Sequence, residues 1–224
     1  MISPDLSALV VDRMAAALIV LAIGSLMLPS LRAGIVALGV QSLLLVAIGA
    51  AVALADAEPG LWVAVAVTFV VKVLVIPFVL TRALELVRLK REVDPVLPDR
   101  LVLLGGVALV LVGYRAASGL ALGGGQALAV AIGLMLVGGL MMVTRRKTLS
   151  QVIGLVTLEN GLYLLALVAT TGLPLAVELA VLFDLLVGAI LLAILTGRIS
   201  MTFDTINTDR LNALRDRPVR VRPR

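Results

Sequence analysis

The chain has 224 residues, of which 61% are hydrophobic and 15% are charged, and its mean hydropathy is +1.16. A soluble globular domain is about half apolar and about a quarter charged, so this composition predicts a membrane protein. The chain has no His and no Cys, which excludes iron–sulfur clusters, disulfides, thiolate metal sites and ordinary haem ligation within it. If the protein works in a redox system, another subunit carries the electrons.

Seven long apolar runs follow one another along the chain, each close to the about 20 residues that a helix needs to cross a bilayer. They are unbroken Leu, Val, Ala and Ile runs, whereas the strands of a membrane barrel alternate in polarity. We therefore expect an all-α, polytopic transmembrane helix bundle of seven spans, at 6–28, 33–55, 61–81, 101–121, 126–144, 149–171 and 174–196. Asp12 and Arg13 interrupt the first span, and Tyr114 and Arg115 interrupt the fourth.

Charged segments divide the chain into four parts: a three-helix membrane segment at 1–81, a cytoplasmic loop at 82–100, a four-helix segment at 101–198 and a basic tail at 199–224. The loop is expected to begin as a helical extension of the third span and to end at Pro95 and Pro98. The tail is expected to be a short interfacial helix or a docking segment for a soluble partner. The N-terminus has no basic region followed by a small-residue cleavage site, so we predict no signal peptide.

The positions of the basic residues predict the orientation. With the N-terminus outside, all 19 lysines and arginines lie in inner segments except Arg13, Arg115 and the intramembrane Lys72. Cytoplasmic loops carry such an excess of Lys and Arg, which predicts an N-out, C-in topology. The net charge of +5 follows from this topology, so it does not indicate nucleic-acid binding.

Four ionisable residues lie inside the apolar runs: Lys72, Glu159, Glu178 and Asp184. A charge near the bilayer centre costs a few kcal/mol, so such a residue is rare unless a partner or a function holds it there. Glu159 comes twelve residues after Lys147, which is about 18 Å along a helix and close to mid-bilayer. We expect Glu159 to hold and release a proton, with a hydrogen-bonded structural role as the alternative.

The polar and glycine neighbours of Glu159 predict a packed site. Asn160 supplies a polar contact beside the carboxyl group, while Gly154 and Gly161 allow another helix to approach. Glycines at 105–106, 123–125 and 138–139 likewise predict close helix contacts or a flexible turn.

The last predicted span carries two acids. Asp184 comes fourteen residues before Arg198, about 21 Å along a helix, and is therefore also near mid-bilayer. Glu178 comes six residues earlier, about 120° away around the helix axis, so the two acids are not expected to share a proton. Glu178 is four residues from Pro174, so a place near the outer interface is its alternative, and Asp184 is the stronger candidate.

Lys72 is central in the third span, ten residues from both Trp62 and Arg82. Pro77 removes the hydrogen bond to the carbonyl of Val73, which predicts a polar patch in a bent helix beside the ammonium group. Two interpretations stay open. Lys72 either changes charge state or modulates a neighbouring carboxylate, or it forms a permanent ion pair with Glu159 or Asp184.

The residues TRRKTLSQVIGLVTLENGLYLLAL at 144–167, with ELAVLFDLLVGAILLAIL at 178–195, resemble a known family. The chain is similar over its whole length to component E of hydrogenase-4 and formate-hydrogenlyase complexes. Residues 126–198 also resemble the K-type subunit of respiratory complex I and the C-type subunit of multisubunit sodium/proton antiporters. The shared features are two basic residues, IGL, an Asn six residues after that Gly, and an acid four residues before Gly188.

The resemblance also implies roles for single residues. Asp184 falls where the K-type subunit has its last-span Glu, and Asn160 falls on the K-type Asn. The other K-type Glu falls at Val156, and Glu159 is one helical turn further along the same face. Component E proteins have Glu-Asn at this place, so the pattern favours component E over a K-type subunit.

The resemblance implies a non-redox membrane-arm subunit of a complex with a [NiFe]-hydrogenase-type peripheral arm. Its partners would be antiporter-like and quinone-site-type membrane subunits, with lipid around them. The chain would bind no cofactor, and the Ni-Fe centre and iron–sulfur clusters would lie in partner subunits. Lys72, Glu159, Asp184 and Glu178 would belong to the path for protons or sodium ions, with Asn160 and Pro77 as polar support.

Two other functions are compatible with the residues. The chain could belong to a multisubunit cation/proton antiporter without a redox partner, or it could be a purely architectural subunit with its charges held in static pairs. An architectural role predicts that neutralising Glu159 or Asp184 affects assembly only.

Overall fold

The computed structural model describes residues 4–56, 59–86, 97–120, 125–169 and 188, and the described part of the chain is all-α. Its helices are α1 (Pro4–Leu26), α2 (Leu31–Asp56), α3 (Pro59–Thr68), the π-helix η1 (Phe69–Val75), α4 (Ile76–Leu86), α5 (Asp99–Gly119), α6 (Gly125–Thr144) and α7 (Thr148–Ala169). Helices α3, η1 and α4 follow one another without a break, so the described residues form six helical segments long and apolar enough to cross a membrane.

These six segments coincide with the first six predicted spans, which confirms the expectation of an apolar helix bundle for this part of the chain. The seventh predicted span, at 174–196, lies outside the described residues apart from Gly188. Gly188 is buried, and a side-chain carbon at that position would lie 3.8 Å from Cγ1 of Val71 in η1.

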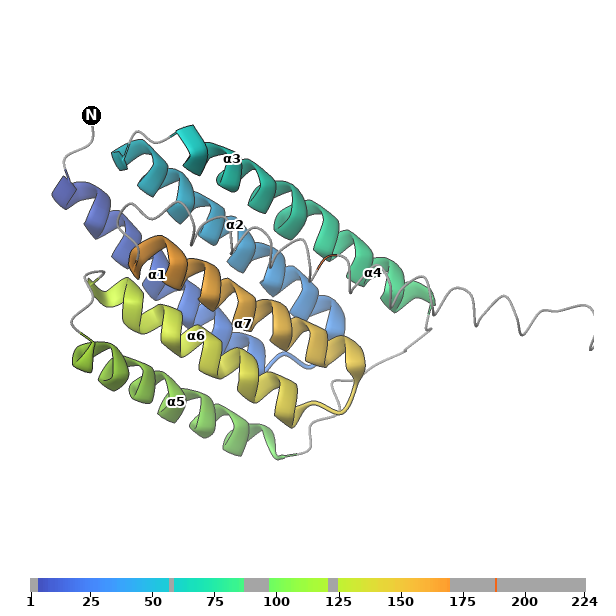
Figure 1. The fold of residues 1–224 in the computed structure, drawn as a ribbon. Helices are drawn as coiled ribbons and strands as arrows, with labels where there is room; N and C mark the ends of the chain where they lie inside the picture. Colours follow the sequence, from blue (N-terminus) through green and yellow to red (C-terminus); the bar gives the residue numbers. More distant parts are fainter. Residues whose placement is uncertain (1–3, 57–58, 87–96, 121–124, 170–187, 189–224) are drawn as a thin grey trace, which may run out of the picture.

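The helices lie side by side along one common direction (Figure 1). The pair α6 and α7 is central: α5 and α1 pack against α6, while α2 packs against α7 and also against α1 and the helix formed by α3, η1 and α4. The core between them is aliphatic, with fully buried side chains such as Leu18, Leu45 and Leu164. Large apolar side chains such as Val36 and Val143 are exposed on the outside, as expected for helices that face lipid.

Glycines bring α6 and α7 into backbone contact. A side-chain carbon at Gly154 would lie 2.9 Å from the carbonyl oxygen of Gly138, and one at Gly161 would lie 2.7 Å from the backbone nitrogen of Met135. No side chain fits at such distances, so the prediction that Gly154 and Gly161 admit a neighbouring helix is confirmed. By contrast, a side-chain carbon at Gly139 would have nothing within 4 Å, so this glycine makes no such contact.

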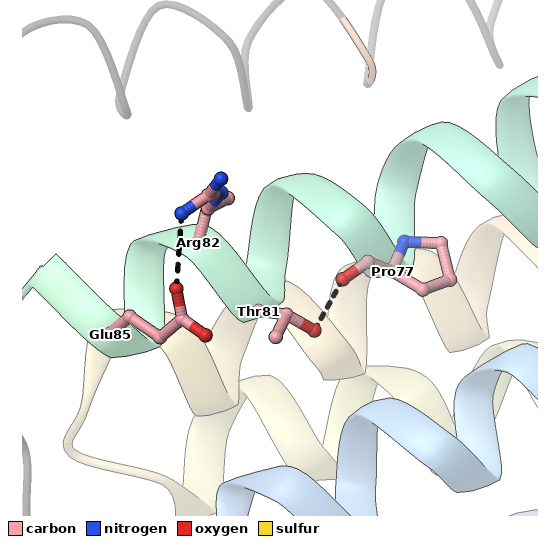
Figure 2. Close-up of polar contacts among 4 residues, drawn as sticks. All are labelled: Pro77, Thr81, Arg82 and Glu85. Atoms are coloured by element: carbon pink, nitrogen blue, oxygen red, sulfur yellow. Dashed lines mark hydrogen bonds and ion pairs between the residues drawn. The ribbon is translucent and has the colours of Figure 1, made fainter.

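The third span continues past the predicted membrane boundary as a helix. Helix α4 ends at Leu86, so the expected helical extension is confirmed to that residue, and α5 begins at Asp99 directly after Pro98. Figure 2 shows the polar end of α4, where the Thr81 hydroxyl donates to the carbonyl of Pro77 at 2.7 Å. Arg82 and Glu85 form an exposed ion pair at 3.4 Å, which contributes little to stability because water screens it.

Asp12, which interrupts the first span, caps a different helix. Its Oδ1 accepts a hydrogen bond at 3.1 Å from the backbone N–H of Ala127, in the first turn of α6. Gly125, at the start of α6, has a φ of +54° and approaches the same carboxylate. A carboxylate at a helix N-terminus is stabilised by the free N–H groups and by the helix dipole. The acid in the first span therefore joins α1 to the start of α6.

We expect Asp12→Ala to destabilise the protein by about 1 kcal/mol, because the first turn of α6 loses its capping oxygen. Thermal unfolding of the purified chain in detergent, followed by circular dichroism, should then have a midpoint about 2–4 °C below that of the unmodified protein. Asp12→Asn is the matched variant, since it keeps an acceptor oxygen and should lose less. An unchanged midpoint for Asp12→Ala would show that the cap is not needed.

Candidate functional site

The buried lysine of the third span lies in a π-helix. η1 covers Phe69–Val75, with Lys72 at its centre, and the N–H of Ile76 bonds to the carbonyl of Val71 five residues earlier. Pro77 follows at once, in the first turn of α4. Proline cannot donate to the preceding turn, and single π-helical turns are frequent at functional sites. The expected helix irregularity is thus present, and its form is a wide turn.

The Lys72 side chain is fully buried and points at α7. Its Nζ donates a hydrogen bond to Oδ1 of Asn160 at 3.2 Å and lies 3.8 Å from Oε1 of Glu159. The ammonium group also lies 5.2 Å from the centre of the Tyr163 ring, within the range of a cation–π contact. We call Lys72, Glu159, Asn160 and Tyr163 the Lys72 cluster.

The Lys72 cluster is sealed from the outside of the described bundle. Lys72 and Asn160 have no exposed surface, and Glu159 and Tyr163 are 1% exposed. Residues 159, 160 and 163 are presented by one turn of α7, which Gly161 holds against α6. Both partners of the ion pair lie near the middle of their helices, as the spacing from Arg82 and Lys147 predicted.

The Lys72 ammonium contacts two acceptors of different charge. The Lys72–Glu159 separation of 3.8 Å is an ionic contact, whereas the shorter contact of the ammonium is to the neutral Asn160 amide. An ammonium group has three N–H donors, so it binds an amide and a carboxylate together. The cluster therefore holds a positive group, a carboxylate and a neutral amide in contact inside the bundle.

The structure brings together three of the predicted site residues and leaves others untested. Lys72, Glu159 and Asn160 meet, so Lys72 pairs with Glu159, one of the two acids that the sequence offered for it, while Pro77 follows the π-helix nearby. Glu178 and Asp184 lie outside the described residues. Among the described residues, no three acidic side chains gather in a way that would hold a metal ion.

Sequence reasoning missed Tyr163, Gln41 and Ser42. Tyr163 is four residues after Glu159, which puts both on one face of α7, and this spacing was the available signal. Gln41 and Ser42 are buried on α2, which packs against η1 and α7. The Gln41 Oε1 and the Ser42 hydroxyl have no hydrogen-bond partner within the described part of the chain. Gln41 and Ser42 could have been singled out from the sequence, because they are two adjacent polar residues in the middle of an apolar span.

The fold and the Lys72 cluster define a class: a membrane-type helix bundle with a buried charge pair at its centre. Among known proteins, hydrogenase-4 component E of Escherichia coli K12 is 28% identical over 165 residues, which cover 69% of this chain and 73% of that protein. The same values hold for hydrogenase-4 component E of Escherichia coli O157:H7 and of Shigella flexneri. The chain is homologous to hydrogenase-4 component E, so the resemblance predicted from its motifs is confirmed.

A further relative covers a smaller part of the chain. The uncharacterized protein Rv0085 of Mycobacterium tuberculosis is 36% identical over 91 residues, which is 41% of this chain and 41% of that protein. No protein-family model and no solved structure matches the chain.

Proposed function

We propose that this chain is a non-redox membrane subunit of a [NiFe]-hydrogenase-type complex, in which its buried charges contribute to proton or sodium translocation. The observation that carries the proposal is the sealed pair of Lys72 and Glu159 at the centre of a homologue of hydrogenase-4 component E. A buried ion pair costs desolvation energy, and its value in a membrane protein is often functional.

The proposed topology adds one span to the six helical segments that the structure describes. A seventh span at 174–196 would follow α7, with the N-terminus outside and the C-terminus inside. The described helices support this orientation, because Arg32, Arg82, Arg100, Arg145 and Lys147 lie at or beyond the helix ends that would face the cytoplasm. Asp184 and Glu178 would add carboxylates to the path, as the sequence predicts. The membrane would be a prokaryotic inner membrane.

The mechanism needs no redox group in this chain. Electron transfer would take place in partner subunits, which hold the Ni-Fe centre and the iron–sulfur clusters of such complexes. A charge change in a neighbouring subunit would alter the proton affinity of Glu159 through space, and Lys72 would stabilise the carboxylate form. Asn160 would hold the ammonium in place, since its amide oxygen accepts a hydrogen bond from Lys72 that does not depend on a charge on Asn160.

The first test is to identify the partners. The tagged chain would be purified from membranes in mild detergent and the co-purifying proteins identified by mass spectrometry. We expect a hydrogenase-like large subunit, iron–sulfur proteins and antiporter-like membrane subunits. Antiporter subunits without any redox protein would instead assign the chain to a cation/proton antiporter, and recovery of the chain alone would contradict the proposal.

We then expect the complexes that assemble with Glu159→Gln to lose most ion translocation while their electron transfer continues. The neutral amide keeps the shape of the side chain but cannot carry a proton. Translocation is measured as acidification of inverted vesicles with a pH-sensitive dye. Glu85→Gln is the matched control, because Glu85 is an exposed acid at the end of α4 and should leave translocation unchanged. Normal acidification with Glu159→Gln would exclude this carboxylate from the path.

A further inference from the structure

A second polar site lies at the end of the bundle where α6 turns into α7, far along the helices from the Lys72 cluster. It is a shallow depression that opens at the surface of the bundle. Its polar lining comes from Ser25, Ser30, Arg145 and Ser150, and Leu31, Met141 and Ile153 are among its apolar lining residues. We call this depression the Arg145 pocket.

Arg145 carries a buried positive charge at the pocket wall. Its side chain is 4% exposed, and its Nη2 donates to the carbonyl of Leu26, at the end of α1, at 2.5 Å. That acceptor is neutral. Burial lowers the pKa of the Arg145 guanidinium, and the negative charge of Asp99 offsets part of that shift. Since a guanidinium has five N–H donors, one carbonyl leaves much of its capacity to bind an anion.

Ser150 supplies a second, independent sign of a ligand. The residue is 3% exposed, and its hydroxyl has no hydrogen-bond partner within the described residues. It lies in the first turn of α7, whose leading N–H groups have no partner within the helix. A buried hydroxyl without a partner costs free energy, so such a group usually binds a water molecule or a ligand.

Two helix N-termini converge on the same pocket. Ser30 caps α2, where its Oγ accepts from the N–H of Ala33 at 3.2 Å, and α7 begins at Thr148. The positive ends of these two helix dipoles face the pocket beside Arg145, while α1 and α6 end on the same side of the bundle. Helix N-termini bind phosphate through these same N–H groups. A water molecule would satisfy Ser150, whereas an anion would also meet the part of the Arg145 charge that Asp99 does not compensate.

We propose that the Arg145 pocket binds a phosphate group that carries net negative charge, with Arg145, Ser150 and the first turn of α7 as its donors. The pocket lies directly after the last apolar residues of α6, which corresponds to the membrane interface in the six-span bundle. The phosphate is therefore either the headgroup of an anionic phospholipid or a free phosphate ion. The apolar lining from Leu31, Met141 and Ile153 would pack against the first carbons of a lipid.

The test uses the full chain, purified and delipidated in detergent. Binding of inorganic phosphate is measured by thermal shift, and binding of short-chain phosphatidylglycerol and phosphatidylcholine by native mass spectrometry. We expect one tightly bound phosphatidylglycerol, and Arg145→Gln should weaken it about ten-fold because a charge-assisted hydrogen bond is lost. Arg146→Gln is the matched control, since it removes the same charge from the exposed neighbouring position.

A second variant keeps the test decisive if Arg145→Gln does not fold. Ser150→Ala retains the Arg145–Leu26 hydrogen bond and should weaken binding about three-fold. Binding of phosphatidylglycerol alone identifies a lipid headgroup site, and stabilisation by inorganic phosphate as well identifies a site for the phosphate group from either source. Any one of three results would overturn the proposal. Arg145→Gln and Arg146→Gln could weaken binding equally, Ser150→Ala could leave binding unchanged, or neither phosphatidylglycerol nor inorganic phosphate could bind.

Discussion

Replacing Lys72 by Met is expected to reduce assembly of the protein strongly, whereas combining that change with Glu159→Gln restores it. Removing one member of a buried ion pair leaves the other charge without compensation, which costs about 3–5 kcal/mol. The double variant leaves two neutral side chains of similar size, and it restores the balance. Assembly is measured as the yield of monodisperse tagged protein from detergent-solubilised membranes.

The control for Lys72→Met is Arg82→Gln on the same long helix. Arg82 forms an exposed pair with Glu85, 3.4 Å apart, and its removal should leave the yield unchanged (Figure 2). A normal yield for Lys72→Met would show that the buried pair is not coupled energetically. The double variant also tests function: if it assembles and translocates ions normally, the pair is architectural and the proposed role in translocation is wrong.

The second large effect is expected at the contact of α6 with α7. Gly154→Ala and Gly161→Ala each place a methyl group within 3 Å of backbone atoms of α6, so the two helices have to separate. Overpacking of this kind costs about 1–3 kcal/mol, and here the obstructing atoms are backbone atoms that cannot rotate away. We expect the thermal midpoint of the purified chain to fall by several degrees and ion translocation to fall with it, because Gly161 adjoins Asn160.

Gly139→Ala is the matched control for this contact. Gly139 lies on α6 beside Gly138, but a methyl group there meets nothing within 4 Å. It should be neutral or slightly stabilising, since alanine favours a helix more than glycine does. If Gly139→Ala and Gly154→Ala had the same effect, helix propensity would explain both and the close approach of α6 to α7 would not matter.

Much of the bundle follows from hydropathy, because a bilayer imposes both the length and the apolar character of its helices. The depth of the Lys72 cluster also follows from residue counts: distances of ten residues to Arg82 and twelve to Lys147 predict that the two charges lie at similar depths. Which helices meet does not follow from such counts. The contact between η1 and α7 depends on rotation about each helix axis, which the uniformly apolar runs do not specify.

Other features could not be predicted because they depend on contacts between distant residues. Asp12 interrupts a hydrophobic run, and only the nearby start of α6 explains it. Arg145 resembles any basic loop residue in the sequence, yet it is buried against the end of α1. Pro77 predicted an irregular helix, but the residue pattern alone does not decide between a kink and a π-turn, and α2 packs against this part of the span.

The π-helix makes the position of Lys72 sensitive to chain length. A residue added to or removed from an α-helix turns everything beyond it by about 100°, and the wide turn of η1 accommodates its extra residue between Phe69 and Val75. Deleting one residue there would leave the hydropathy of the span almost unchanged. It would nevertheless convert the wide turn to ordinary α-helix, which keeps the two halves of the span in their orientation but shifts the residues inside the turn, Lys72 among them, relative to α7. The register of this one turn therefore determines whether the charge pair forms.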